Sequence, residues 1–460
     1  MPEKIKRLFA QVDMTEGRPW EKIVAFTVPM LVGNIAQQLY NTVDSIVVGR
    51  YVGDNALAAV GSAGPIFNLL LVLFVGISMG AGIMVSQYFG SRDRENLSKT
   101  IGNSITLTAI ASLFLMIVGT FAIRPVLELL NTPDSIIDWC TSYLMILLWG
   151  IAGLAYYNIL CGILRGLGDS VSALVYLLVA TVLNIILDLW FVAGLNMGVS
   201  GVALATVIAQ LVSAVLCMFK LRKMTNLFDL RLCYLKPEKK STFTVIRLGL
   251  PSGITQAIFS MAMVVVQSLT NSFGEMVIAA NVIIMRVDGF AMMPNFSFGT
   301  AMTTYSGQNV GARNFDRVKQ GAKQGTLIAA GTSAVITGLI LLFGPYLMAI
   351  FTTTEELVAL SANMMRILAV GYIAMAVTQS LSGIMRGAGD TMTPMWISMI
   401  TTVIIRVPLA YGIAYLTRTP ALPQGRYECI WISMLVAWVL GAVITTICYR
   451  IGHWKKKALG

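Results

Sequence analysis

Apolar residues recur along this chain in runs of about 20, which is long enough for a helix to cross the hydrocarbon core of a bilayer. The runs are continuous, whereas the strands of a membrane β-barrel alternate polar and apolar residues over short segments. The pattern predicts an all-α membrane protein of twelve transmembrane helices. The expected spans are 23–48, 57–82, 98–122, 135–160, 171–193, 200–219, 250–273, 277–302, 325–350, 357–381, 392–416 and 428–449.

Composition supports a membrane protein and excludes several kinds of chemistry. Of the 460 residues, 56% are hydrophobic and 12% charged, whereas a soluble chain carries about 25% charged residues. The six cysteines have no CxxC spacing and are expected to pack as apolar residues. His453, the single histidine, lies in the C-terminal tail. Zinc and haem sites are therefore not expected, and we expect no cofactor.

The basic residues predict the orientation of the chain in the membrane. If the N-terminus is cytoplasmic, 26 of the 33 lysines and arginines fall on the inner side and four in outer loops. Arg286, Arg366 and Arg406 fall inside spans. This bias is the positive-inside rule, and it predicts a cell (inner) membrane protein whose terminal segments, 1–22 and 450–460, are both cytoplasmic. Because topology explains the net charge of +11, no nucleic-acid partner is expected.

The two halves of the chain repeat. The segment Gly162–Ser170 recurs 221 residues later as Gly383–Thr391, with six of nine residues identical. Both copies contain Arg-Gly-x-Gly-Asp, which turn chemistry explains as a tight connection between two helices. We expect two six-helix lobes, 23–219 and 250–449, joined by a cytoplasmic linker over 220–249. Since six is even, the lobes should be related by a pseudo-twofold axis along the membrane normal.

The candidate site is an acidic cluster within the N-terminal half. Asn184 and Asp188 are four residues apart in an apolar run, so on a helix they share one face. Asp44 in the first span and Thr206 in the sixth lie at a similar depth, roughly 8 to 10 Å from the outer span ends at about 1.5 Å per residue. Ionisable groups inside a membrane usually face a bundle interior and serve a function. Four oxygen-bearing side chains suit a sodium ion or a shared proton.

The repeat supplies an internal control, because the acids occur in only one half. Asn184 and Asp188 align with Ile405 and Leu409, and Asp44 aligns with Val265 or Val266. A scaffold role explains the repeated turns, whereas the acids require an explanation specific to the first half. The alternative is that both acids reach the outer interface or bond the backbone.

In the second half, Asp288 lies near the middle of its span and Arg406 in the middle of another. Asp288 either pairs with Arg406 as a structural ion pair or contacts substrate, and the sequence leaves both open. We expect the residues lining a substrate cavity to include Asn34, Gln38, Gln256, Asp288 and Arg286.

Taken together, the motifs resemble the MATE (multidrug and toxic compound extrusion) family over the whole chain. They are Val43-Asp44-Ser45-Ile46-Val47-Val48-Gly49, Gln87-x-x-Gly90-x-Arg92, the two Arg-Gly-x-Gly-Asp turns and Asn184-x-x-x-Asp188. The acids in the first half are similar to the DinF-like branch of that family. The resemblance implies that Asp44, Asn184, Asp188 and Thr206 form a proton- or sodium-responsive site.

The sequence therefore predicts a transporter rather than an enzyme: an antiporter that exports small organic cations in exchange for protons or sodium ions by alternating access. A flippase for anionic lipid-linked substrates is the alternative, supported only by Arg286 and Arg406. An intramembrane enzyme lacks a nucleophile–base or metal constellation, and a two-lobed repeat favours a transporter over a channel. The expected partners are the lipid bilayer and the transported cations, and the chain is expected to act as a monomer. The choice between proton and sodium stays open.

Overall fold

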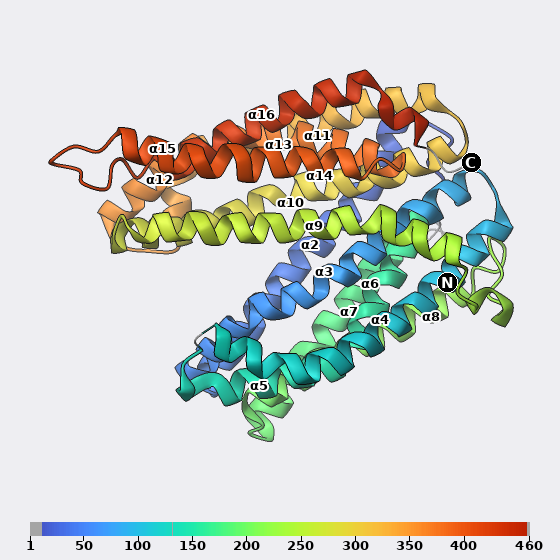
Figure 1. Cartoon of the computed structure of the whole chain (residues 1–460), viewed down its shortest axis with the longest axis horizontal. Helices are drawn as coiled ribbons and strands as arrows, with labels where there is room; N and C mark the ends of the chain where they lie inside the picture. The colour runs from blue at the N-terminus through green and yellow to red at the C-terminus, as the bar shows by residue number, and fades with distance from the viewer. Residues whose placement is uncertain (1–11, 131, 458–460) are drawn as a thin grey trace. The chain divides into compact units, whose positions relative to one another are not determined.

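The computed structural model describes residues 12–130 and 132–457, and no β-strand occurs among them. The first half contains these α-helices: α2 (Pro19–Tyr51), α3 (Asp54–Gly90), α4 (Arg94–Leu129), α5 (Asp134–Trp149), α6 (Ile151–Gly166), α7 (Ser170–Asp188) and α8 (Gly198–Arg222). The second half contains α9 (Lys239–Asn271), α10 (Glu275–Gly311), α11 (Phe315–Ala349), α12 (Glu355–Ala369), α13 (Gly371–Gly387), α14 (Met392–Met399), α15 (Val407–Leu416) and α16 (Cys429–Ile451) (Figure 1). Two π-helices, η1 (Leu189–Gly194) and η3 (Ile400–Arg406), continue α7 and α14.

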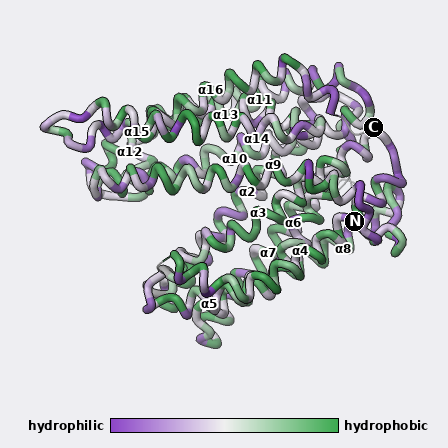
Figure 2. Tube along the Cα trace, in the orientation of Figure 1, coloured by the Kyte–Doolittle hydropathy of each residue, from purple (hydrophilic) through white to green (hydrophobic). Residues whose placement is uncertain are grey.

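Each of the twelve predicted spans overlaps one of these helices or a bent pair of them. By length and composition, ten helical segments among the described residues are able to cross a membrane as single helices. Two more spans are broken: α5 and α6 meet at 52°, and α12 and α13 meet at 42°. Figure 2 shows hydrophobic residues along most of the helices and hydrophilic residues mainly at their ends and connections. The prediction of an all-α, multi-pass membrane fold is confirmed.

The chain divides into two compact units whose bounds differ from the predicted lobes. Unit 1 comprises Val28–Gly253 and the segment that ends at Asp13, and unit 2 comprises Met14–Thr27 and Ile254–Gly460. The first turns of α2 thus group with unit 2, and the first turns of α9 group with unit 1. Helix α9 begins inside the predicted linker, at Lys239. Residues 1–11 and 458–460 of the predicted terminal segments lie outside the described residues.

Close helix packing explains the repeated glycines. A Cβ atom on Gly162 of α6 would lie 2.9 Å from the backbone oxygen of Ser78 on α3. In unit 2, a Cβ atom on Gly383 of α13 would lie within 2.4 Å of the backbone oxygen of Gly299 on α10. Residues 78 and 299 are themselves one repeat apart, so both units use the same contact. Small residues let the backbones of membrane helices approach closely.

The Arg-Gly-x-Gly-Asp segments are helix connections, as turn chemistry predicts. Gly168 and Gly389 adopt φ of 87° and 95°, which glycine tolerates best. The next residue, Asp169, caps α7 by accepting from the backbone nitrogen of Ser172 at 2.9 Å. Asp390 accepts in the same way from the backbone nitrogen of Thr393 at 3.3 Å. These two aspartates hold the inter-helix turns and take no part in the acidic cluster.

Candidate functional site

Helix α7 carries its polar pair on the face turned into unit 1. Asn184 and Asp188 are both 0% exposed, whereas Val182 and Ile186 on the opposite face are 58% and 57% exposed. Asp188 is the last residue of α7 and is followed directly by the π-helix η1. Such π-helical turns are found frequently at functional sites. The pair is thus held in the interior at a local irregularity of the helix.

The side-chain amide of Asn184 bridges two carboxylates. Its nitrogen and oxygen are assigned from the surrounding groups, and one orientation satisfies all of them. In that orientation the nitrogen donates to Asp44 Oδ1 at 2.9 Å and to Asp188 Oδ2 at 3.1 Å, and the amide oxygen accepts from the backbone nitrogen of Thr206 at 3.2 Å. The four residues predicted to form the cluster therefore lie in contact, on helices α2, α7 and α8.

Two tyrosines complete the cluster. The hydroxyl of Tyr40, one turn before Asp44 on α2, lies 3.1 Å from Thr206 Oγ1, and it interacts electrostatically with the Asp44 carboxyl group. Tyr143 of α5 lies close enough to both acids to interact with them electrostatically. The sequence analysis missed both residues. The four-residue spacing between Tyr40 and Asp44 is enough to predict that both lie on one helix face. No local sequence pattern points to Tyr143.

One oxygen of the cluster is buried and has no hydrogen-bond donor. Asp188 Oδ1 has no partner among the described residues, although buried polar atoms are nearly always bonded. The carboxyl groups of Asp44 and Asp188 also lie within hydrogen-bonding reach of one another. Two adjacent carboxylates and an orphaned oxygen are balanced when a proton or a small cation binds between them.

A cavity of about 190 Å³ lies further along the same helices. Its polar lining includes Asn34 and Gln37 from α2, Asn158 and Arg165 from α6, and Ser170 from α7. On α2, the stripe formed by Asn34, Gln37, Tyr40 and Asp44 follows helical spacing, so one face runs from the cavity to the acids. Gln37 and Asp44 are separated by about 10 Å of helix. The cavity and the acidic cluster therefore belong to one interface between α2 and α7.

The other residues predicted to line a substrate cavity lie in different parts of the structure. Asn34 lines the cavity in unit 1, but Gln38 does not, and its neighbour Gln37 takes that position. In unit 2, Gln256 and Arg286 are exposed side chains on α9 and α10. Asp288 is buried, with 9% of its surface exposed. The placement of Gln256, Arg286 and Asp288 in a substrate cavity therefore stays a prediction.

Asp288 has partners of its own within unit 2. Its Oδ1 accepts from the hydroxyl of Tyr372 on α13 at 2.9 Å, and it interacts electrostatically with Arg406. Arg406 ends the π-helix η3, and its Nε is buried without a hydrogen-bond partner among the described residues. The two charged groups attract each other but form no direct ion pair among the described residues, so a structural pair and a substrate contact both stay predictions.

These features define a class: a multi-pass helical membrane protein with a buried acidic site inside one of two repeated units. The sequence profile described as MatE matches the chain twice, over residues 29–190 and 251–412. The two matches begin at Pro29 and Pro251, so the profile detects the same internal repeat. The chain belongs to the MatE family.

Related proteins match this chain over almost its full length. The chain is 29% identical over 447 residues to the probable multidrug resistance protein YoeA of Bacillus subtilis, covering 96% of this chain and 95% of that protein. It is 25% identical over 448 residues to the probable multidrug resistance protein NorM of Thermotoga maritima, covering 95% and 94%. It also matches a solved structure titled as the outward-facing conformation of a multidrug resistance MATE family transporter, with a TM-score of 0.89, 26% identity, and 97% and 99% coverage. The chain is accordingly a membrane transporter and not an enzyme.

Proposed function

We propose that this transporter exports small organic cations in exchange for protons or sodium ions, and that the exchange takes place at the cluster of Asp44, Asn184, Asp188 and Thr206. The names of its relatives, probable multidrug resistance proteins, support drug export. The observation that carries ion coupling is the buried, unpartnered Asp188 Oδ1 beside a second carboxylate.

The mechanism is competition for negative charge. A cationic substrate bound near the cluster is attracted by the two carboxylates. When a proton or sodium ion binds between Asp44 and Asp188, the net charge of the pair falls and the attraction weakens. The substrate then leaves to the outside. By linkage, the ion and the substrate lower each other's affinity by the same factor.

The amide of Asn184 suits proton coupling. With its nitrogen toward the acids, it donates to both carboxylates, as a cluster holding at most a proton requires. A sodium ion would be held by the carboxylate oxygens themselves, because hard cations prefer oxygen donors.

The test is efflux of a fluorescent organic cation from cells or vesicles, with an imposed proton gradient, an imposed sodium gradient, or neither. We expect efflux from the wild type to depend on one of the gradients, and Asp188→Asn and Asp44→Asn to abolish it at normal expression. Asp138→Asn is the matched control, because Asp138 is an exposed acid paired with Arg124 at 3.5 Å. Gradient-driven efflux by both cluster variants at the wild-type rate would remove the acids from the mechanism.

The predicted alternative, a flippase for anionic lipid-linked substrates, depended on cationic residues lining a cavity. Arg286 is exposed on α10, and Arg406 is attracted electrostatically by Asp288. Neither residue lines the cavity of about 190 Å³ in unit 1, and this alternative has no specific observation in its favour.

A further inference from the structure

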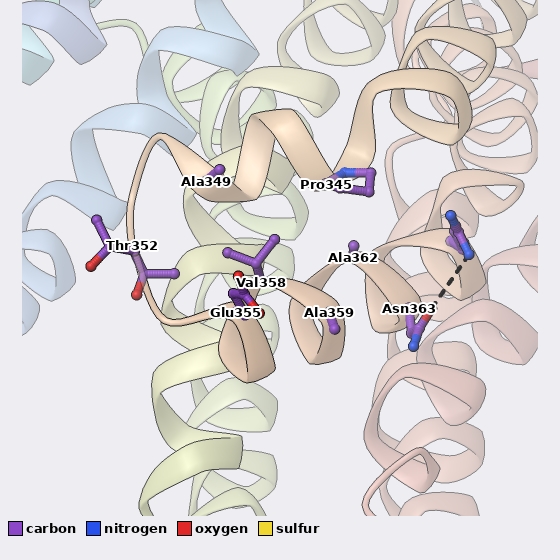
Figure 3. A pocket seen from close by; sticks show the side chains of 10 residues that line it. Pro345, Ala349, Thr352, Glu355, Val358, Ala359, Ala362 and Asn363 are labelled. Carbon is purple, nitrogen blue, oxygen red and sulfur yellow. Dashed lines mark hydrogen bonds between the residues drawn. The ribbon is translucent and has the colours of Figure 1, made fainter.

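A groove lies between the end of α11 and the start of α12 in unit 2. Its volume is about 580 Å³, within the roughly 300–1,000 Å³ of small-molecule sites. In Figure 3, Pro345 and Ala349 of α11 form one wall, opposite Val358 and Ala362 of α12. The groove is lined by Pro345, Ala349, Thr352, Thr353, Glu355, Val358, Ala359, Ala362, Asn363 and Arg366. It is separate from the acidic cluster, which belongs to unit 1.

The lining from α12 is one face of that helix, and it ends in a cation. Glu355, Ala359, Asn363 and Arg366 follow helical spacing, and all four are exposed. Arg366 is eleven residues beyond Glu355, or about 16 Å along the helix axis. It therefore lies within the predicted span and not at its rim. A charged side chain at such a depth is rare in membrane helices and requires a partner.

No carboxylate among the described residues pairs with Arg366. Its Nη1 donates to Asn363 Oδ1 at 3.4 Å, the hydrogen bond drawn in Figure 3. That contact leaves the positive charge uncompensated and leaves the amide nitrogen of Asn363 as a second donor beside it. Arg124 on α4 is the opposite case, because Glu128 at 3.3 Å and Asp138 at 3.5 Å pair with it. The Arg366 end of the α11–α12 groove thus presents hydrogen-bond donors and a positive charge that no carboxylate of the described residues neutralises.

The surface next to the groove is apolar and exposed. On α11, Tyr346 and Ile350 flank the groove residues Pro345 and Ala349, and they are 74% and 75% exposed. In a membrane protein, exposed apolar helix faces contact lipid acyl chains. The groove therefore has the two features that a phospholipid requires, an apolar wall for its acyl chains and a cationic end for its phosphate. The carboxylate of Glu355 lies at the opposite end of the groove and repels anions. An anion is therefore expected to bind near Arg366.

We propose that the groove between α11 and α12 binds an anionic membrane phospholipid, with Arg366 and Asn363 contacting its phosphate. A planar guanidinium forms paired, charge-assisted hydrogen bonds with phosphate oxygens. Asn363 contributes through its amide nitrogen while its oxygen accepts from Arg366. The bound lipid supplies the counter-charge that the described residues do not place beside Arg366.

The test uses the purified full-length protein in mild detergent, titrated with phosphatidylglycerol or phosphatidylcholine, with bound lipids counted by native mass spectrometry. We expect the wild type to bind phosphatidylglycerol in preference to phosphatidylcholine. Arg366→Gln should weaken phosphatidylglycerol binding by about tenfold, the usual effect of losing a hydrogen bond to a charged group. Arg366→Lys should bind with intermediate affinity, and Arg124→Gln, the matched control, should bind as the wild type does.

A second variant shows whether a loss of binding in Arg366→Gln comes from the groove itself or from misfolding of that variant. Ala359→Phe leaves Arg366 in place but fills the groove, and it should also weaken phosphatidylglycerol binding. If Arg366→Gln and Ala359→Phe both bind this lipid with wild-type affinity, the proposal is wrong. Inorganic phosphate distinguishes a soluble anion from a lipid. It should leave the melting temperature of lipid-free protein unchanged, and an Arg366-dependent increase would overturn the lipid assignment.

Discussion

The amide nitrogen of Asn184 lies 2.9 Å from Asp44 Oδ1, although the two residues belong to helices far apart in the sequence. The same nitrogen reaches Asp188 one turn along α7. A neutral amide thus holds two carboxylates together that would otherwise repel each other. This bridge fixes the geometry of the cluster before any ion arrives.

Replacing Asn184 by Leu should remove that bridge while keeping the branched shape of the side chain. We expect loss of ion-dependent efflux and a decrease in stability of about 2 kcal/mol, because hydrogen bonds to charged groups are lost in the interior. Ile186→Ala is the control on the same helix, since Ile186 is 57% exposed on the opposite face. Efflux and melting temperature of the two purified variants check the prediction. Wild-type efflux from Asn184→Leu would show that the bridge is dispensable.

Tyr40 and Thr206 should act as a coupled pair. Each of the variants Tyr40→Phe and Thr206→Val loses the contact of 3.1 Å between the two hydroxyl groups. We expect each to raise the ion concentration that supports half-maximal efflux by roughly fivefold, which corresponds to about 1 kcal/mol. The double variant should show less than the product of the two effects, because the contact is lost only once. Fully multiplicative effects would mean that the two hydroxyl groups act independently.

The pair formed by Asp288 and Arg406 should behave as structural. Asp288→Asn can still accept from Tyr372, but it leaves Arg406 without its counter-charge. Because the two groups attract each other without a direct ion pair, we expect a loss of stability below the roughly 3–5 kcal/mol that is typical when a buried ion pair loses one partner. The double variant Asp288→Asn, Arg406→Gln should recover much of that stability, as measured by thermal unfolding. Loss of efflux in a variant of unchanged stability would instead place Asp288 in the transport pathway.

The contact of α3 with α9 should tolerate no added side chain. A Cβ atom on Gly249 would lie within 2.0 Å of the backbone oxygen of Gly76. We expect Gly249→Ala to force the helices apart and to destabilise the protein by about 1–3 kcal/mol. Gly338→Ala is the matched control, because no atom lies within 4 Å of its added Cβ. An equal melting temperature for the two variants would contradict the close approach.

The loop after α8 should become less stable as the pH falls. The Arg94 guanidinium contacts Asp229 Oδ1 at 2.9 Å and holds the pKa of that carboxyl group below its usual range. A lowered pKa in the folded state stabilises the loop above the ordinary aspartate pKa of about 3.9, and this contribution is lost as the pH falls through the folded value. Proteolysis within residues 223–231 should therefore increase at low pH in the wild type. In Asp229→Asn it should be elevated already at neutral pH and should change little with acid.

The sequence by itself was enough to predict the spans, the repeat and the residues of the acidic cluster. Long apolar runs leave the backbone no alternative to helices in lipid, because each polar backbone group must be bonded within its own segment. A carboxylate in such a run is costly, so Asp44 and Asp188 were identifiable without coordinates. Helical spacing placed Asn184 on the face of Asp188.

Only the tertiary structure decided what these residues meet. It placed Tyr143 near the acids, and it showed that Gln37, not the predicted Gln38, lines the cavity. Such contacts depend on the rotation of whole helices about their axes and not on local spacing in the sequence. It grouped the first turns of α2 and α9 with the other half of the chain, which the linear order of spans does not predict. It also left Arg366 facing an open groove, since the absence of a counter-charge depends on every helix packed around a position.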